Sequence, residues 1–407
     1  MPRPAGNTRL KAARVAAGYA SQQALADALG VGVRQVRRWE SDTPPWPQAE
    51  IQQALTRILG QDLTALGFTS SGHGPDPVRR TLVTGTIAAA GLAAVPTRAA
   101  AVMQPASVAT DFQAVTRSHR RLYWSLAPAV LHPSALAHAE LGRMLLTETA
   151  GQTRASVAAA LSESLLLVGR IEFFDLREPD RASGTWLRAL QAAGEADDQL
   201  LGAAILAHTA FIPGWAGDRD AAVERMVAAR TYARRGPASL GFLAWLDAVE
   251  AECETRCGHT RTALHLIGHA EDVLARCGEH PDTEWMDWFS ATRLAAFKGN
   301  TQLKAGHLPQ ARETLLAVLA DLDPAEKQTS VILGDLAAVG AAAGSPEEAC
   351  EYAVRALDQL ERTWYATGMD RVRDVRRALA PHQHEQCVRD LDERLYGWAT
   401  TVSALAR

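Results

Sequence analysis

Cysteine is scarce in this 407-residue chain, which holds five cysteines at wide spacing. An odd, scattered set does not suit a disulfide framework, and no N-terminal stretch has the pattern of a signal peptide, so we predict a reducing, cytoplasmic location. Lysine is scarce too. Only four of the 42 basic residues are lysine, which indicates a G+C-rich coding genome more than a particular chemistry. The apolar run near residues 81–95 is short and poor in large side chains, so no membrane span is predicted.

Patterns typical of catalytic and metal sites are lacking as well. No Gly-rich phosphate loop, Ser/His/Asp arrangement or pair of carboxylates stands out, so we predict neither an enzymatic activity nor a cofactor. Two groups of possible metal ligands occur: Cys253 and Cys257 with His259, and His382 and His384 with Cys387. Since a zinc site normally needs a second ligand pair at matching spacing, we interpret both groups as ordinary helix residues.

Charge is distributed unevenly along the chain, whose formal net charge is −4. Residues 1–67 contain eight basic and five acidic residues, which gives this segment +3 and leaves −7 for the remainder. A basic head on an acidic body is typical of a nucleic-acid-binding module joined to a domain that avoids nucleic acid.

Residues 21–40 predict two short helices joined by a tight turn. Ser21 can cap the first helix, because its side-chain oxygen can accept a free N–H of the first turn, and Gly30 ends it. The apolar side chains of this helix form one stripe: Ala24, Leu25, Ala28 and Leu29. The second helix begins at Val33, buries Val36 and Trp39, and carries polar side chains in front: Arg34, Gln35, Arg37 and Arg38. Such a helix is suited to enter the major groove of DNA.

A set of positions around these two helices has a diagnostic spacing: Leu10, Lys11, Arg14, Gly18, Ser21, Gln22, Leu25, Ala26, Leu29, Gly30, Val31, Val36, Trp39 and Glu40. In this spacing, over roughly residues 7–67, the chain resembles the xenobiotic-response-element (Cro/C1-type) helix-turn-helix family. One departure is Asp42, where the family usually has a glycine after the position of Glu40. This departure affects how the chain leaves the second helix.

The resemblance implies that the first of the two helices holds a phosphate and the second reads bases of double-stranded DNA. Gln22 would then hold the phosphate, and the base-reading helix would present the other DNA-binding residues: Val33, Arg34, Gln35, Arg37 and Arg38. Of these, Val33, Arg34 and Arg38 are expected to face base edges. Arginine suits guanine because its fork makes two parallel hydrogen bonds, and valine suits the methyl group of thymine.

The composition divides the chain into three predicted segments. Residues 1–69 form the DNA-binding domain, closed by a helix over 48–59 and a short apolar turn or helix over 61–68. Residues 70–108 form a linker with a weak apolar helix. Within it, residues 79–101 resemble a twin-arginine export signal, but such signals act near the N-terminus of a chain. We therefore favour a hinge between domains, with a membrane-tethered regulator as the weaker alternative.

The third segment, residues 109–407, is helical throughout and is interrupted at intervals of 38 to 48 residues. In four interruptions an alanine follows a glycine by five positions: Gly217 and Ala222, Gly258 and Ala263, Gly306 and Ala311, Gly344 and Ala349. Pro179 and Gly184 form a degenerate fifth pair. Glycine permits the turn between paired helices, and the small residue lets their backbones approach. The unit from Gly299 to Pro324 resembles a tetratricopeptide repeat, so we predict an α-solenoid of tetratricopeptide-like hairpins for sensing and dimerisation.

Helices over residues 112–131 and 134–147 are expected to begin this stack, and residues 370–407 to cap it. In such a stack the first helix of each pair lines the concave face. Counting from the turns places nine residues there as a ligand-binding groove: Phe173, Arg177, Phe211, Trp245, Glu252, Arg256, Arg293, Asn300 and Lys304. The resemblance to tetratricopeptide domains implies that Asn300 and Lys304, four positions apart, help to hold a peptide backbone or a carboxylate. The alternative is a solvated surface with packed aromatics.

Together these observations predict an all-α DNA-binding transcriptional regulator rather than an enzyme. Its solenoid is expected to bind a peptide or small-molecule effector, and the chain to act as a homodimer on a two-fold symmetric operator. The alternative from a different class is a helical scaffold that binds a protein partner and retains a vestigial helix-turn-helix.

Overall fold

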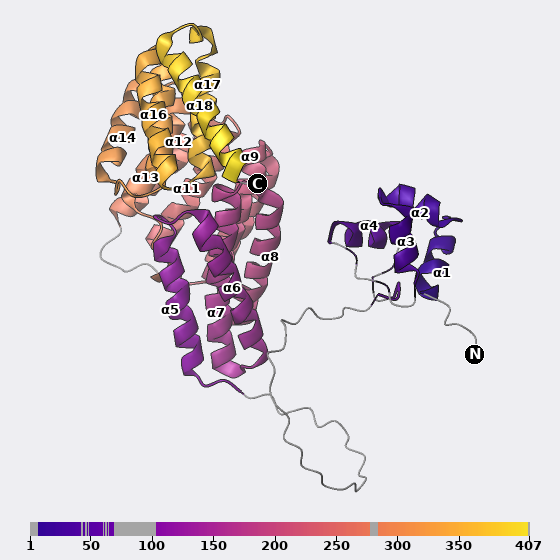
Figure 1. Cartoon of the computed structure of the whole chain (residues 1–407). Helices are drawn as coiled ribbons and strands as arrows, with labels where there is room; N and C mark the ends of the chain where they lie inside the picture. The colour runs from indigo at the N-terminus through magenta and orange to yellow at the C-terminus, as the bar shows by residue number, and fades with distance from the viewer. Residues whose placement is uncertain are drawn as a thin grey trace, which may run out of the picture. The chain divides into compact units, whose positions relative to one another are not determined.

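The computed structural model describes residues 7–68 (except 42, 43, 45, 46, 48, 60, 62 and 64), 103–276 and 284–405. All regular structure in these residues is helical, which confirms the all-α prediction. The chain divides into two compact units, Met1–Ala94 and Val95–Arg407 (Figure 1). Most of the predicted linker, including residues 79–101, lies outside the described residues. Within the described ranges, no helix is long and apolar enough to cross a bilayer.

The described helices of the first unit are α1 (Thr8–Ala16), α2 (Gln22–Leu29), α3 (Val33–Trp39) and α4 (Ala49–Leu59). Ser21 caps α2 as predicted, because its Oγ accepts the N–H of Ala24 at 3.1 Å. Gly30 ends α2 in the left-handed conformation, with φ at 67°. Asn7 caps α1 and also donates to the carbonyls of Trp39 and Leu66, which ties the start of the unit to its end.

The core of the first unit forms on the predicted side of α3, where Val36 and Trp39 are buried. Phe68 packs edge-on against Trp39, with ring centroids 6.5 Å apart, so the described part of residues 61–68 closes the core as a turn. The predicted stripe of α2 was partly wrong. The buried residues are Leu25, Ala26 and Leu29, whereas Ala28 is exposed and Ala24 is half-buried. The helix packs on α3 and α4, and a narrower face than predicted is covered.

The second unit is a stack of antiparallel helices, introduced by α5 (Ser107–Leu122) and α6 (Pro128–Thr147). Five hairpins follow: α7 (Gly151–Arg170) with α8 (Pro179–Ala196), α9 (Gln199–Ala216) with α10 (Arg219–Ala233), α11 (Leu240–Arg256) with α12 (Thr260–Ala275), α13 (Ala291–Lys304) with α14 (Leu308–Asp321), and α15 (Thr329–Ala342) with α16 (Pro346–Arg362). The last helices are α17 (Ala366–Ala378) and α18 (Gln386–Leu405). Successive first helices contact one another, which gives a solenoid-like arrangement.

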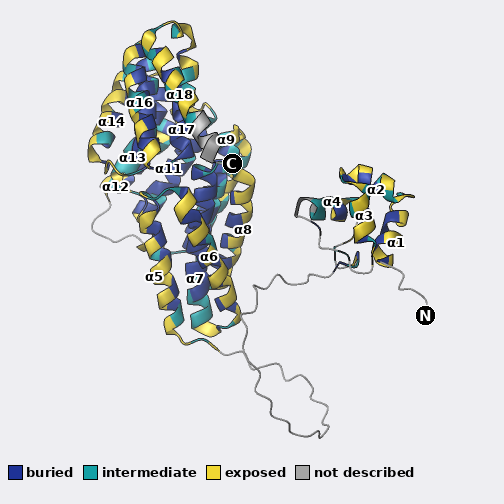
Figure 2. Ribbon diagram, in the orientation of Figure 1, coloured by how far each residue is buried: buried dark blue, intermediate teal, exposed yellow. Residues whose placement is uncertain are grey.

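The two helices of a hairpin differ in burial. First helices such as α11 are buried nearly all round, whereas second helices such as α12 and α16 are amphipathic, with one buried face. Figure 2 shows this difference as dark blue inner helices and yellow edges on the outer ones. A helix that is buried all round must be covered on both sides, so each first helix packs against the first helices of neighbouring hairpins as well as against its own hairpin partner.

Four turns of the stack confirm the predicted glycine–alanine spacing. Gly217, Gly258, Gly306 and Gly344 have φ angles of 74° to 84°, a region that side chains disfavour. The alanine five positions after each of them is at most 2% exposed: Ala222, Ala263, Ala311 and Ala349. Each of these alanines is buried in the first turn of its second helix, and in the last hairpin Gly340 lies close against the backbone of Ala349.

The degenerate fifth turn was predicted two residues too late. The left-handed residue between α7 and α8 is Arg177, with φ at 59°, and the buried alanine five positions later is Ala182. Gly184 is exposed in the middle of α8. Because the left-handed position holds arginine instead of glycine, a glycine search misses this turn. The predicted helix over residues 112–131 was also wrong, since the chain breaks after Leu122 and restarts at Pro128.

The stack also curves back on itself, so that the end of its first hairpin touches α17 and the segment before it. A π-helical turn, η1 (Ile171–Asp175), extends α7 toward the C-terminal helices. There Trp364 Nε1 donates to the carbonyl of Asp175 at 3.1 Å, and Thr367 Oγ1 donates to that of Phe174 at 3.0 Å. The backbone N–H of Lys327 donates to the carbonyl of Trp124 at 3.0 Å. These contacts close the inner face of the solenoid into a cavity.

Candidate functional site

One candidate site is the outer face of α3 in the first unit. Arg34, Arg37 and Arg38 are exposed there, and among the described residues no ion pair holds any of them. Val33 and Gln35 are half-buried beside them. The predicted polar face is therefore an exposed cluster of three arginines that have no acidic partner within the described residues, an arrangement suited to phosphates and to the acceptor edges of guanine.

Gln22 is held at the foot of this face by a buried ion pair. The pair joins Arg14 Nε to Glu40 Oε1 at 2.7 Å, with side-chain exposures of 5% and 6%. Gln22 Nε2 donates to the other carboxylate oxygen of Glu40 at 2.5 Å. The start of α2 is thereby fixed to the end of α3. One amide hydrogen and the carbonyl oxygen of Gln22 take no part in this contact, so the side chain can still donate to a phosphate.

The second candidate site is the cavity inside the second unit. The space that it encloses, counted together with its open mouth, is about 910 Å³. Many of its walls are aromatic: Tyr123, Trp124, Phe174, His208, Phe211, Trp215, Trp245, Trp288, Phe289, Phe297 and Tyr365. Such walls offer large flat apolar surfaces, whereas hydrogen-bonding groups must come from the few polar residues between them.

The structure places the nine predicted groove residues in three places. Six line the cavity: Phe211, Trp245, Glu252, Arg256, Arg293 and Asn300. Phe173 and Arg177 line a neighbouring groove that Arg256 shares. Lys304 is exposed and lines neither, so the predicted patch of Asn300 with Lys304 does not form in the cavity. Asn300 is buried and faces inward, whereas Lys304 lies in the last turn of α13, where the helix has left the cavity.

One end of the cavity is an internally paired network. Arg256 Nε lies 2.8 Å from Glu252 Oε1, and Asn300 Nδ2 donates to Glu252 Oε2 at 3.3 Å. Arg371 Nε lies 3.0 Å from Asp335 Oδ1. Burial lowers the pKa of Arg256, with the neighbouring Arg371 acting in the same direction, and burial raises the pKa of Asp335. The charges at this end balance in pairs.

The other end holds Arg170, the last residue of α7. Its guanidinium carbon lies 4.7 Å from the ring centroid of Tyr123, 4.9 Å from that of Trp288 and 5.5 Å from that of Trp124. Its Nε is buried and has no hydrogen-bond partner in the described part of the chain. Arg293, on α13, lies 3.9 Å over the Trp124 ring and leaves its Nη1 buried without a partner. Donors and aromatic faces therefore gather at this end.

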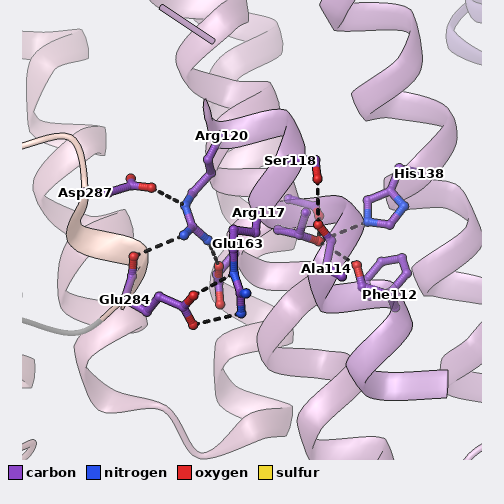
Figure 3. A network of polar contacts seen from close by, with 11 residues as sticks. Phe112, Ala114, Arg117, Ser118, Arg120, His138, Glu163, Glu284 and Asp287 are labelled. Atoms are coloured by element: carbon purple, nitrogen blue, oxygen red, sulfur yellow. Dashed lines mark hydrogen bonds and ion pairs between the residues drawn. The ribbon is translucent and has the colours of Figure 1, made fainter. Parts of the chain in front are cut away.

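Trp288 is held in place by a network that joins three separate segments (Figure 3). Arg120, on α5, forms a buried ion pair with Glu163 of α7 and donates to the carbonyl of Glu284 at 3.1 Å. Its Nε also lies 3.3 Å from Asp287 Oδ2. Figure 3 shows Arg120 pointing between these partners. The network anchors the segment that begins with η2 (Glu284–Met286), and this segment brings Trp288 to the cavity wall.

Two buried titratable groups near the cavity have displaced pKa values. Burial raises the pKa of Glu163 to about 7, although the nearby Arg120 opposes the shift. Burial also lowers the pKa of His208 to about 3, helped by Arg170. His208 is therefore neutral near pH 7, and its Nδ1–H donates to the carbonyl of Ala204 at 2.8 Å. The imidazole ring of His208 therefore contributes an aromatic surface to the cavity wall and no positive charge.

The sequence pattern missed most of this site. Arg170 is the last residue of α7, Trp124 follows α5, and Trp288 lies in the connection before α13. Counting from the turn glycines does not reach these positions. A signal for them existed in the closely spaced aromatics at Trp285, Trp288 and Phe289, because large aromatics in a connection usually pack on something. Within the described residues, no group of three histidine, cysteine or acidic side chains could hold a metal ion.

Comparison with known proteins adds little to this geometry. No protein-family model matches the sequence, and no curated protein matches it. Among solved structures, the chain is similar to the crystal structure of BtubC (BKLC) from P. vanneervenii, with 18% sequence identity and a TM-score of 0.39. The match covers 56% of this chain and 89% of that chain, and at this level it carries no argument about function.

Proposed function

We propose that the protein is a DNA-binding transcriptional regulator of the helix-turn-helix type, with a tetratricopeptide-like second unit that binds a peptide or small-molecule effector. The observation that carries the proposal is the face of α3, where Arg34, Arg37 and Arg38 are exposed and unpaired in the described structure. An exposed cluster of like charges serves no purpose in packing, whereas it matches the phosphates and base edges of a major groove.

The ion pair of Arg14 with Glu40 supports the same proposal. It fixes Gln22 beside the end of α3, so a phosphate-binding group and the base-reading helix keep one relative position. Sequence-specific binding requires that the phosphate-binding group and the base-reading helix keep a fixed relative position, because phosphate contacts set the register in which base contacts are made.

The cavity supports the sensing part of the proposal. It is lined by aromatic walls and by buried polar atoms that have no hydrogen-bond partner in the part of the chain that the structure describes, including Asn300 Oδ1, Gln328 Oε1 and Trp288 Nε1. Buried polar atoms cost free energy when they are unpaired, so a cavity that gathers several of them is suited to a ligand. The effector would regulate by binding one arrangement of the second unit more tightly than another.

Salt-dependent binding to genomic DNA fragments tests the proposal. The wild-type chain should bind duplex DNA with an affinity that falls steeply with salt, and the triple variant Arg34→Ala/Arg37→Ala/Arg38→Ala should lose most of that dependence. Arg57→Ala, an exposed arginine on α4, is the matched control and should change little. Equal binding by the triple variant and the wild type would instead favour the scaffold with a vestigial helix-turn-helix.

The proposal includes a homodimer on a two-fold symmetric operator. One reading helix contacts few bases, and dimers of this type place two reading helices about 34–36 Å apart. Light scattering at micromolar concentration should give twice the mass of one chain, and footprints should show two half-sites. A monomer with a single half-site would exclude this part of the proposal.

A further inference from the structure

All but one of the arginines that line the cavity are paired with a carboxylate. Four arginines line it, and three of them have carboxylate partners: Arg256 with Glu252, Arg293 with Glu326, and Arg371 with Asp335. Arg170 has no ion-pair partner among the described residues, although it is only 8% exposed. The nearby carboxylate of Asp175 is already paired with Lys327. A buried cation without a counter-charge is costly, so this end of the cavity favours an anion.

Hydrogen-bond donors gather around the same position. Arg170 Nε, Arg293 Nη1 and Trp288 Nε1 are buried without partners in the described structure. The ring contacts place them in one cluster, since Arg170 lies against Trp288 and both arginines lie against Trp124. Charge-assisted hydrogen bonds from such donors are the strong contacts that proteins use for carboxylates and similar anions.

The wall next to this cluster is made of flat rings. The Trp288 centroid lies 6.0 Å from that of His208 and 6.1 Å from that of Trp245, and His208 lies 5.2 Å from Trp245. His208 is uncharged near neutral pH, so these rings together form an apolar, polarisable surface. Aromatic faces stack best on another planar ring.

The closure of the solenoid limits the size of the ligand. An extended peptide lies along an open groove, whereas here the contacts of η1 with Trp364 and Thr367 close the inner face. The enclosed volume of about 910 Å³ includes the mouth, so the closed part is smaller still. A compact small molecule fits this space better than a chain of several residues.

We propose that the cavity binds a small planar aromatic molecule with one anionic group, a choice that rests on the sensing role proposed above for the second unit. The anionic group lies at Arg170 and takes hydrogen bonds from the donors of Arg293 and Trp288. The aromatic body stacks among the rings of His208, Trp245 and Trp288.

Calorimetric titration of the full chain with three probes tests this assignment. Naphthalene-2-carboxylate should bind, and naphthalene-2-carboxamide, which has the same ring but no charge, should bind at least tenfold more weakly. A tetrapeptide of three alanines and a C-terminal phenylalanine should bind more weakly than the carboxylate. This comparison uses only the wild-type chain. Equal binding of the two naphthalenes, no binding of either at millimolar concentration, or preference for the peptide would overturn the proposal.

Variants locate the anionic group. Arg170→Met should remove the preference for the carboxylate, whereas Arg170→Lys, which keeps the charge, should retain part of it. Arg143→Met, an exposed arginine on α6 that pairs only with Glu140, is the control and should bind like the wild type. If Arg170→Met unfolds, Arg293→Gln should show the same loss in weaker form. Unchanged preference in a folded Arg170→Met would place the anion elsewhere and overturn the assignment.

The same preparations separate this inference from the DNA-binding proposal. Duplex DNA binding, measured by mobility shift, should be unaffected by Arg170→Met in the absence of probe. A chain that binds DNA and rejects the aromatic carboxylate would refute the ligand class alone. A chain that binds the carboxylate and not DNA would refute the regulator alone.

Discussion

Lys327 and Asp175 form an ion pair in which neither side chain is more than 1% exposed. They lie 152 positions apart, and Tyr123 donates its hydroxyl to the second oxygen of Asp175 at 3.1 Å. Burial raises the pKa of Asp175 and lowers that of Lys327 to about 8, although each partner opposes the shift of the other. The pair joins the π-helical end of α7 to the start of α15.

Removing one member of this pair should be strongly destabilising. Lys327→Met leaves Asp175 buried without its cation, which we expect to lower the free energy of unfolding by about 3–5 kcal/mol. Lys298→Met is the matched control, because Lys298 forms a partly exposed pair with Glu271 and its loss should cost less than about 1 kcal/mol. Urea denaturation measures both. The double variant Lys327→Met/Asp175→Asn should recover part of the loss, and equal effects of the two single lysine variants would contradict the prediction.

Because of Glu163, the free energy of unfolding should fall as the pH rises from 4.5 to about 7. Burial raises its folded-state pKa to about 7, above the ordinary value of 4.5, so between these values the folded state binds more protons than the unfolded state. Raising the pH through this window therefore lowers the free energy of unfolding, by at most about 1.4 kcal/mol per pH unit. Glu163→Gln cannot lose a proton and lacks this term.

Urea denaturation of the wild type and Glu163→Gln at about pH 5 and about pH 8 measures the effect as a difference between the two proteins. Other titrating groups, including the buried His208, cancel in that difference. The wild type should lose stability relative to the variant as the pH rises. A constant difference at both pH values would show that Glu163 titrates at its ordinary pKa.

Glycine should be the more stable residue at both left-handed turn positions, Gly306 and Asp197. Gly306→Ala should lower the free energy of unfolding by about 1–2 kcal/mol, because φ at 79° crowds a Cβ against the following carbonyl although the space around it is open. Asp197, with φ at 55° at the end of α8, carries that strain already, so Asp197→Gly should stabilise by a few tenths to about 1 kcal/mol. Thermal unfolding of both variants checks the signs, and a stabilising Gly306→Ala would contradict the assigned turn.

Arg34 and Arg38 of α3 should determine which DNA sequence is bound, whereas Gln22 should contribute equally to the binding of every sequence. Arg34→Ala and Arg38→Ala should each weaken operator binding by about 1–3 kcal/mol and relax preference at one base position. Gln22→Ala should weaken binding to operator and random duplexes equally, because it removes a phosphate contact. Binding competition against a randomised duplex pool measures both effects. Wild-type preference in both arginine variants would exclude base reading by α3.

Local signals predicted much of the fold and less of the site. The caps at Ser21 and Gly30 and the four glycine turns depend on the conformation of a few neighbouring residues, so their spacing is visible in one sequence. The turn at Arg177 was missed because tertiary contacts hold a non-glycine residue in a left-handed conformation. Arg177 pairs with Asp370 and lies 4.4 Å from the Trp215 ring, partners that no local pattern identifies.

Most of the residues that line the cavity were not predicted, for a related reason. Repeat counting finds residues that project from regular helices, and so it found Trp245, Arg256 and Asn300. It also included Lys304, because the periodicity does not show where a helix turns away from the cavity. Arg170 and Trp288 come together only through the closure of the stack and the Arg120 network, which join segments more than a hundred residues apart.

The contact of η1 with α17 and the segment before it has a consequence for how the second unit folds. Linear repeat arrays unfold from their ends, because each repeat touches only its neighbours. Here Trp364 and Thr367 donate hydrogen bonds to residues 175 and 174, so fraying of the C-terminal helices from α17 onward also exposes the end of α7. The unit should melt in one cooperative transition instead of a series. Such distant contacts should also make its folding slower than that of an open array of the same length.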